Sequence, residues 1–350
     1  MTFDELLERY EPRLAAAFRE CIDAIRSGII LKAVVDRLER GDVAGAVRAI
    51  QIEPEAFAAL ELALQEAFNA GGVNMVQGLP QLVAPDGTRV LFQFGVRNLM
   101  AETMLRNLSS MLVTNIVDDQ REALRIAFEA GLSRGQNPTK TALDVVGRVS
   151  RVTGRREGGV IGLTSRQVEF IERARESLST GNVEGMRRYL DMKTRGRRYD
   201  RTVAKAIREG KPVPDAMVSN IIGRLSDRNL KLRGDTIALE ETRTALFSVR
   251  DVAIRQQIEA GKITAQEVTK KWKHSGSENP RLQHIALSMQ SKKEGIPLDQ
   301  PFIAPDGTAL MYPHAPGVPA RHRIGCKCRV EYDIDWVAAG LRRYRARIAA

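Results

Sequence analysis

The chain has 350 residues, with 54 Lys and Arg against 43 Asp and Glu, so its formal charge is +11. This length predicts two domains, or three, with enough chain to bury a core. Hydrophobic residues at 43% and charged residues at 28% exclude wholesale disorder. The basic balance predicts an acidic partner, with nucleic acid the first candidate and an acidic protein surface the second.

The sequence gives no sign of export or of a membrane-spanning segment. Its first residues, MTFDELLERYEPRL, are acidic and amphipathic, whereas a signal peptide is basic and then apolar. No stretch approaches about 18 consecutive apolar residues. Cys21, Cys326 and Cys328 are too few and too unevenly placed for a disulfide framework. We therefore expect a protein that stays in a reducing compartment.

Residues 1–134 are predicted to form an N-terminal helical assembly region. Apolar residues recur at steps of three and four between Leu7 and Ile25, and Thr2 with Glu5 forms a capping box in front of them. Further helix is expected as far as the Gly71-Gly72 pair, which we expect to end it.

A hairpin and a long helix complete this region. Residues 81–95 contain Asp86-Gly87 between two apolar runs, a strong hairpin signal. Residues 96–130 contain no Pro and no Gly, which predicts one long helix. Such helices can pack on a neighbouring subunit, so we expect self-association, with a self-contained bundle as the alternative.

Residues 135–162 are rich in Gly and Arg and are predicted to form a hinge around one short helix. We place the main domain boundary there. Residues 163–335 form the next predicted domain, which begins with a helix capped by Thr164 and Gln167.

The end of this domain is predicted to be a small α+β module. Helices are expected over 213–258, and Thr264 with Glu267 is expected to cap another helix that runs to Trp272. Asp306-Gly307 predicts a second hairpin, within strands and turns over 302–332. The predicted fold class is therefore mainly α, with a small α+β C-terminal module.

Two stretches hold much of the positive charge. Residues 187–211 contain ten Lys and Arg against three acids, and the predicted basic tail, 336–350, has four Arg and no acid. A solvated helix face is the alternative, but the imbalance favours binding to DNA phosphates or to an acidic partner, without base readout. The residues predicted to bind are Arg187, Arg188, Lys193, Arg195, Arg197, Arg198, Arg201, Arg342, Arg343 and Arg345.

Several short motifs follow one another in the C-terminal half. They are a Glu-Thr pair in a helix, a Trp, an Arg-x-x-His, a Tyr-Pro turn and a terminal Cys-x-Cys. The residues are Glu241 and Thr242, Trp272, Arg281 and His284, Tyr312 and Pro313, and Cys326-Lys327-Cys328. In this order they resemble the phage Mu F-like minor head proteins, also called head morphogenesis proteins. The resemblance covers roughly 160–335 and is best from 235 onward. The family has Arg where this chain has Lys327, and usually Asn where it has Gly325.

The resemblance implies a structural virion protein, a minor capsid protein of a tailed bacteriophage. Such a protein is made in the bacterial host cytoplasm and lies at the portal vertex or capsid interior. It acts in head assembly, DNA packaging or genome delivery. The implied partners are the portal protein, a major capsid or scaffold protein, other copies of the chain and the backbone of double-stranded phage DNA. A purely cellular DNA-binding protein is a further alternative.

Cys326, Cys328 and His284 are candidate zinc ligands, because thiolates and imidazoles suit zinc. A fourth ligand could come from His322, His314 or His274. However, paired zinc cysteines are usually separated by two to four residues, and here only Lys327 intervenes. The spacing favours the alternative, a pair of strand residues that face opposite sides and bind no metal.

An enzyme is the alternative of a different class. Some Mu F-like modules are distantly similar to ADP-ribosyltransferases, and Cys326 with His284 or His322 could form a nucleophile pair. The sequence shows no phosphate-binding glycine loop after a strand, no H-E-x-x-H and no G-x-S-x-G. We therefore predict no catalytic residue and no catalytic activity.

Overall fold

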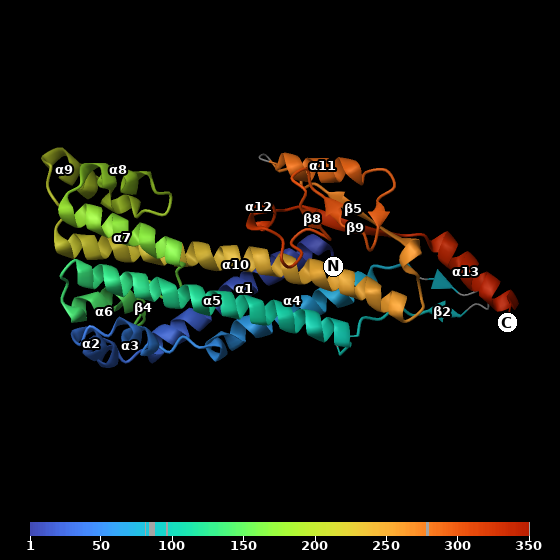
Figure 1. Ribbon diagram of the computed structural model, residues 1–350, viewed down its shortest axis with the longest axis horizontal. Helices are drawn as coiled ribbons and strands as arrows, with labels where there is room; N and C mark the ends of the chain where they lie inside the picture. The colour runs from blue at the N-terminus through green and yellow to red at the C-terminus, as the bar shows by residue number, and fades with distance from the viewer. Residues whose placement is uncertain (81, 84–87, 96, 278–279, 350) are drawn as a thin grey trace. The chain divides into compact units, whose positions relative to one another are not determined.

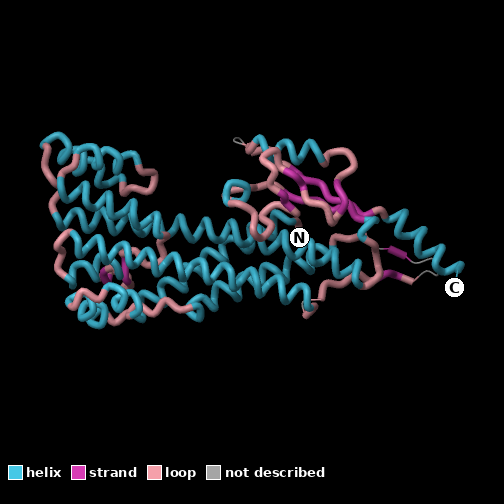
Figure 2. The backbone as a smooth tube through the Cα atoms, in the orientation of Figure 1, coloured by secondary structure: helices cyan, strands magenta, loops and turns pink. Residues whose placement is uncertain are grey.

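The computed structural model describes residues 1–80, 82–83, 88–95, 97–277 and 280–349. The chain is mainly helical with a few short antiparallel strands, which confirms the predicted fold class (Figure 1; Figure 2). No helix among these residues is long and apolar enough to cross a membrane.

The longest helices are α10 (Asp215–Glu259), α5 (Leu99–Ser133), α1 (Phe3–Gly28) and α4 (Ala58–Gln77). Shorter helices lie between and after them. These are α2 (Leu31–Glu39), α3 (Val43–Arg48), α6 (Pro138–Val146), α7 (Ser165–Thr180), α8 (Val183–Asp191), α9 (Asp200–Glu209), α11 (Leu282–Gln290), α12 (Ala320–Arg323) and α13 (Trp336–Ala349).

In the described part of the chain, the strands form one three-stranded sheet and three small hairpins. In the sheet, β5 (Val268–Lys273) lies between β6 (Ile296–Pro297) and β9 (Arg329–Ile334), and both pairings are antiparallel. The hairpins are β1 (Leu82–Val83) with β2 (Arg89–Val90), β3 (Arg148–Val149) with β4 (Arg156–Glu157), and β7 (Phe302–Ile303) with β8 (Ala309–Leu310).

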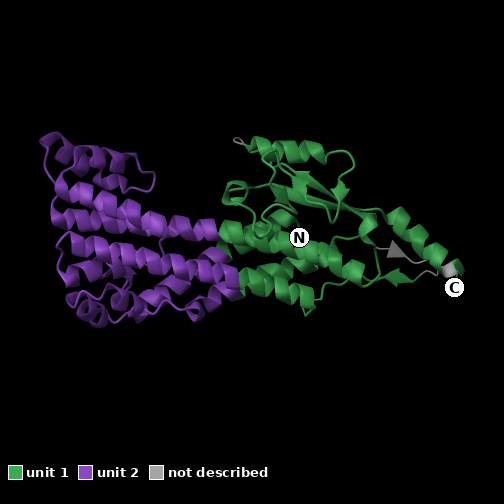
Figure 3. Ribbon diagram, viewed as in Figure 1, with its two compact units in different colours: residues 1–13, 62–109, 238–350 green, residues 14–61, 110–237 purple. Residues whose placement is uncertain are grey.

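The chain divides into two compact units, and neither is continuous in sequence (Figure 3). Unit 1 contains residues 1–13, 62–109 and 238–350, and unit 2 contains residues 14–61 and 110–237. The long helices are shared between them by residue number; α10, for example, belongs to unit 1 from Ala238 onward. The stretch 135–162, which the sequence predicts to be a hinge, lies wholly within unit 2 and contains α6 and the β3–β4 hairpin.

In unit 2, polar side chains hold the segment after this hairpin. The Arg26 guanidinium donates to the carbonyl of Ile161, and the Gln120 amide donates to the carbonyl of Leu163. Thr164 and Gln167 form the predicted capping box at the start of α7. Buried polar groups that gain such partners avoid most of the cost of desolvation.

In unit 1, the C-terminal module folds around an apolar core. Phe247 of α10, Trp272 of β5, Leu287 of α11 and Phe302 of β7 are all buried in it. Phe302 meets the Trp272 ring edge-on, with ring centroids 5.3 Å apart. This core surrounds the candidate site described below.

The prediction that Gly71-Gly72 ends a helix is wrong, since α4 continues to Gln77. A Cβ at Gly71 would lie 2.7 Å from the Leu246 side chain, and one at Gly72 would lie 2.5 Å from the Phe94 ring. The glycines therefore allow close packing, which outweighs their low helix propensity.

The prediction of a helix from Thr264 to Trp272 is also wrong. The capping box of Thr264 and Glu267 forms, but it starts only the short 3-10 helix Ala265–Glu267. Trp272 lies instead in β5, where side chains alternate between buried and less buried positions. Pairing along the whole of β9 replaces the hydrogen bonds that a helix would have made.

The predicted hairpins have different outcomes. The hairpin at Asp306-Gly307 is confirmed, with Phe302 opposite Leu310. In the first hairpin, Leu82 pairs with Val90, while Asp86 and Gly87 lie outside the described residues.

Candidate metal centre

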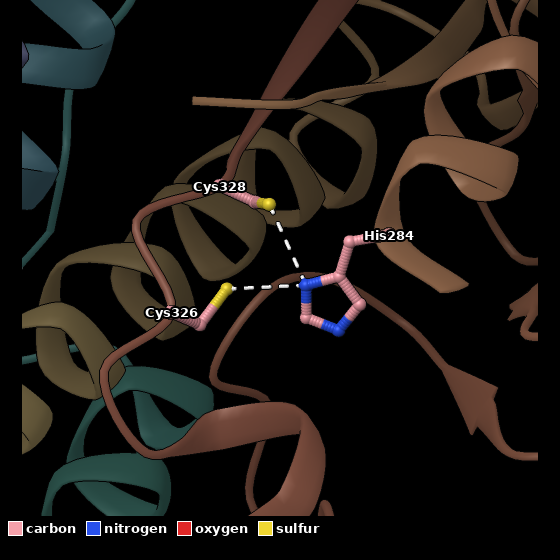
Figure 4. Close-up of side chains that lie close together, drawn as sticks. All are labelled: His284, Cys326 and Cys328. Carbon is pink, nitrogen blue, oxygen red and sulfur yellow. Dashed lines mark hydrogen bonds between the residues drawn. The ribbon is translucent and has the colours of Figure 1, made fainter. Parts of the chain in front are cut away.

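His284, Cys326 and Cys328 come together inside unit 1. The His284 Nδ1 atom lies 3.5 Å from each sulfur, and each residue has an exposed fraction of 3% or less (Figure 4). These are the three ligand candidates that the sequence singled out, and their ligand atoms lie within 4.8 Å of one another.

Two different parts of the chain position these side chains. His284 lies on α11, which packs on β5, and its ring meets the Trp272 ring edge-on at a centroid distance of 5.2 Å. The cysteines lie in the segment just before β9. Cys326 and Cys328 are buried while Lys327 between them is exposed, so both thiols point inward. The expectation that the two cysteines face opposite sides is therefore wrong, because residues two apart in an extended segment share a side.

A chain of hydrogen bonds extends from the far side of His284. Its Nε2 lies 3.2 Å from Nδ1 of His322, whose Nε2 lies 2.9 Å from an oxygen of Asp306. A carboxylate can only accept, so His322 carries its proton on Nε2 and its Nδ1 accepts from His284. His284 then carries its own proton on Nε2, and the lone pair of its Nδ1 faces the two sulfurs. We call Asp306, His322 and His284 the relay.

Hydrogen bonds shift the pKa values of Asp306 and of the two thiols. The hydrogen bond from His322 holds the pKa of Asp306 well below its usual range. The hydrogen bond from the Cys326 thiol lowers the pKa of Cys328, while that shared bond and burial raise the pKa of Cys326. The cluster therefore favours one thiolate that shares a proton with the second sulfur.

Helix α10 fixes the loop that carries the cysteines. A Glu240 carboxylate oxygen accepts from the Gly325 backbone N–H at 2.6 Å, and the other lies 3.3 Å from Nδ1 of His314. His314 in turn donates from Nε2 to the carbonyl of Cys326 at 2.8 Å. Gly325 has φ +69°, a left-handed conformation that Gly and Asn adopt most readily. A glycine at this position therefore allows the bend before Cys326 at little conformational cost.

The remaining candidate ligands lie elsewhere. His314 contacts the Cys326 carbonyl and Glu240, and His274 accepts from the Gly276 backbone N–H. His322 orients His284 through the relay. Sequence reasoning missed Asp306 and Glu240, since nothing in their local sequence reports contacts made 16 and 85 residues away.

The predicted basic residues fall into two groups. Arg187, Lys193, Arg197 and Arg201 are exposed and form no ion pair with a described residue, whereas Arg188, Arg195 and Arg198 contact Glu184, Asp200 and the Tyr199 hydroxyl. In the tail, Arg342 pairs with Glu267 at 2.7 Å and Arg343 donates to the Lys262 carbonyl at 2.9 Å. Arg345 is exposed.

Comparison of the chain with protein-family models, with curated proteins and with solved structures finds no match.

Proposed function

We propose that the chain is a structural minor head protein of a tailed bacteriophage, with a C-terminal module held together by a zinc ion. It would act at the portal vertex or capsid interior, in head assembly, DNA packaging or genome delivery. The observation that carries the proposal is that the residues of the head-protein resemblance, spread over about a quarter of the chain, lie in or around one apolar core in the folded molecule.

The contacts within that core support this reading. The Trp272 ring contacts His284, and Cys326 and Cys328 share the core with Tyr312. The Arg281 guanidinium donates to the carbonyl of Ile324, two residues before Cys326. Thr242 and Glu241 lie on α10, where an Arg323 guanidinium nitrogen lies 3.6 Å from the Glu241 carboxylate. Motifs that lie apart in the sequence thus contact one another in the folded C-terminal module. We infer that they occur together because they build this module.

The donor set suits zinc. Zinc bonds of about 2.3 Å to sulfur and about 2.0 Å to nitrogen in a tetrahedron place the two ligand atoms about 3.6 Å apart. The two sulfur–nitrogen distances here are 3.5 Å, which matches that spacing, and all three ligand atoms lie within 4.8 Å of one another. Bound zinc would supply the cross-link between α11 and the segment before β9, and His284, Cys326 and Cys328 would hold it.

Contact with DNA is part of this proposal. The exposed arginines and lysines over 187–211 offer charge to a phosphate backbone, and few aromatic side chains lie among them for stacking on bases. We therefore expect sequence-independent binding that weakens steeply with salt.

The burial of both cysteines argues against the thiol-dependent alternative. Their exposed fractions are 2% and 3%, so a substrate could reach neither sulfur without opening of the core. The absence of catalytic activity stays a prediction. The alternative, an ADP-ribosyltransferase, also stays untested.

A complementation experiment in the phage that encodes the chain tests the proposal. Removal of the gene is expected to lower the yield of infectious particles through empty or malformed heads, and supply of the wild-type chain should restore it. Supply of Cys326→Ser should restore it poorly. A normal particle yield without the chain would contradict the assignment.

A further inference from the structure

Within the described residues, the contacts that the C-terminal helix α13 makes with the rest of unit 1 lie along one face. Trp336 meets the Phe92 ring edge-on at 5.7 Å, and Ala339 is fully buried. Arg342 and Arg343 add the ion pair and the hydrogen bond described above. These four contacts recur every three or four residues, so they mark a single side of the helix.

The opposite face carries a row of exposed apolar side chains. The exposed fractions are 72% for Val337, 50% for Leu341, 52% for Tyr344 and 68% for Ile348. Their spacing of four, three and four residues is that of the two apolar positions in successive heptads. We call these four residues the α13 stripe. Scattered exposed apolar residues are ordinary, but a row in register along a fixed helix marks an interaction surface.

The shape of the stripe and the charge beside it indicate which kind of partner binds there. From Trp336 to the last residue the chain has four arginines and no acid, and Arg345 lies beside the stripe, exposed. We propose that the α13 stripe binds an amphipathic helix of a different protein, one that is apolar along a narrow seam and carries Asp or Glu on its flanks. This proposal does not depend on the head-protein assignment.

Three other occupants fit less well. A second copy of α13 would bring arginine against arginine, with no acid in the helix to relieve the repulsion. A membrane surface favours a broad apolar face, whereas α13 offers a seam one residue wide because its other side is attached to unit 1. DNA would use the arginines and leave the four apolar side chains exposed to water.

The test uses the full chain and a synthetic peptide of three heptads, with Leu at the seam positions and Glu on both flanks. Binding is measured by fluorescence anisotropy of the labelled peptide. Loss of one buried Leu is worth about a tenfold change in affinity or more, so Leu341→Ser should weaken binding by at least that factor. Arg345→Glu should weaken it too, and a version of the peptide with Lys flanks should bind far less.

Matched controls separate this surface from general stickiness. Leu282 on α11 is 81% exposed, and Arg151 is an exposed arginine of unit 2. Leu282→Ser and Arg151→Glu should leave peptide binding unchanged, and circular dichroism should show that all four variants stay folded.

Each alternative occupant has its own readout. No binding by the wild type, or binding that Leu341→Ser leaves unchanged, would overturn the proposal. Each of three further results, obtained while the peptide does not bind, would also overturn it. Loss of self-association in light scattering on the change Leu341→Ser would assign the stripe to a second copy of the chain. Loss of binding to vesicles of phosphatidylcholine and phosphatidylglycerol, or to duplex DNA, on the same change would assign it to a membrane or to DNA.

Discussion

His284 can bind a metal only through the nitrogen that faces the sulfurs, and the relay decides that this nitrogen is free of a proton. Asp306 accepts from His322, and His322 accepts from His284, so the orientation of one ring depends on a carboxylate two hydrogen bonds away. Outer partners of this kind are what fix the tautomer of metal-binding histidines. At the scale of single residues, the site is therefore five side chains and not three.

The three ligands predict that the purified protein contains zinc. The full chain purified without chelators is expected to contain one zinc per molecule by inductively coupled plasma mass spectrometry. Cys326→Ser should lose it, because one thiolate is replaced by a weak ligand. Cys21→Ala is the control, since Cys21 is buried in unit 2 whereas the three candidate ligands lie in unit 1. Zinc-free wild-type protein, or equal zinc in Cys326→Ser, would contradict the site.

The relay makes a second, separable prediction. His322→Phe preserves a ring stacked on His284, where the centroids are now 5.4 Å apart, but removes the acceptor for His284 Nε2. Zinc affinity in a chelator competition should fall by about 10–100-fold. His274→Phe should leave it unchanged, because His274 lies outside the relay. Unchanged affinity in His322→Phe would mean that the relay does not orient the ligand.

The sequence predicted the three ligand candidates but not that they form a site. Histidines and cysteines are few in this chain, so their chemistry identified them. The short Cys-x-Cys spacing pointed away from a metal, because spacing alone does not show that both thiols face His284. The relay could not be predicted, because its contacts depend on how α11, α12 and the β7–β8 hairpin pack.

Lys270 predicts a pH dependence of stability. Its side chain is buried, its Nζ donates to the Met311 carbonyl at 2.9 Å, and burial lowers its pKa to about 8 from 10.5. Between those values the unfolded chain binds more protons than the folded chain, so this group makes the free energy of unfolding rise with pH.

Lys270→Met removes that contribution. Urea unfolding between about pH 8 and 10.5 should show a smaller rise in stability for Lys270→Met than for the wild type. The difference between the two proteins isolates Lys270 from the cysteines and tyrosines that ionise in the same range. Parallel curves would show that burial does not depress its pKa.

At the scale of elements, glycines in the β3–β4 region hold two backbone segments together. A Cβ at Gly159 would lie 2.5 Å from the Gly147 nitrogen and 2.6 Å from the Val145 carbonyl oxygen. Gly154, at the other end of β4, has open space at the same point and a similar positive φ. The two positions thus differ in packing and not in backbone conformation.

This pair gives a matched test of close packing. Gly154→Ala should cost about 1–2 kcal/mol for its left-handed conformation alone. Gly159→Ala should cost roughly 1–3 kcal/mol more, because backbone atoms cannot move aside as side chains can. Urea denaturation measures both, and equal losses would show that the predicted hinge region is not closely packed here.

Local signals were reliable where the contacts are local. The capping box at Thr164 and the hairpin at Gly307 are confirmed because turns and caps involve neighbours in sequence. Trp272 was misplaced because a capping box specifies a helix start and not a helix length, while the partner strand β9 lies about 60 residues later. Long-range pairing overrides such local preferences.

At the scale of the whole molecule, the excess of positive charge has no single location. Part of it is neutralised inside the fold, as for Arg342 with Glu267, and part is exposed over 187–211. Composition alone predicted an acidic partner but could not separate these two groups. We propose that the exposed Lys and Arg over 187–211 bind the DNA backbone. Arg345, beside the α13 stripe, is proposed to contact an acidic protein partner.

The proposed head-protein function is tested most directly by the composition of purified particles of the phage that we propose encodes the chain. Quantitative mass spectrometry should find the chain in the virion, in a small fixed ratio to the portal subunit. Loss of the chain on DNA release would make it an ejected protein, and its retention would make it a component of the portal vertex or the shell. Complete absence of the chain from mature particles would contradict the account.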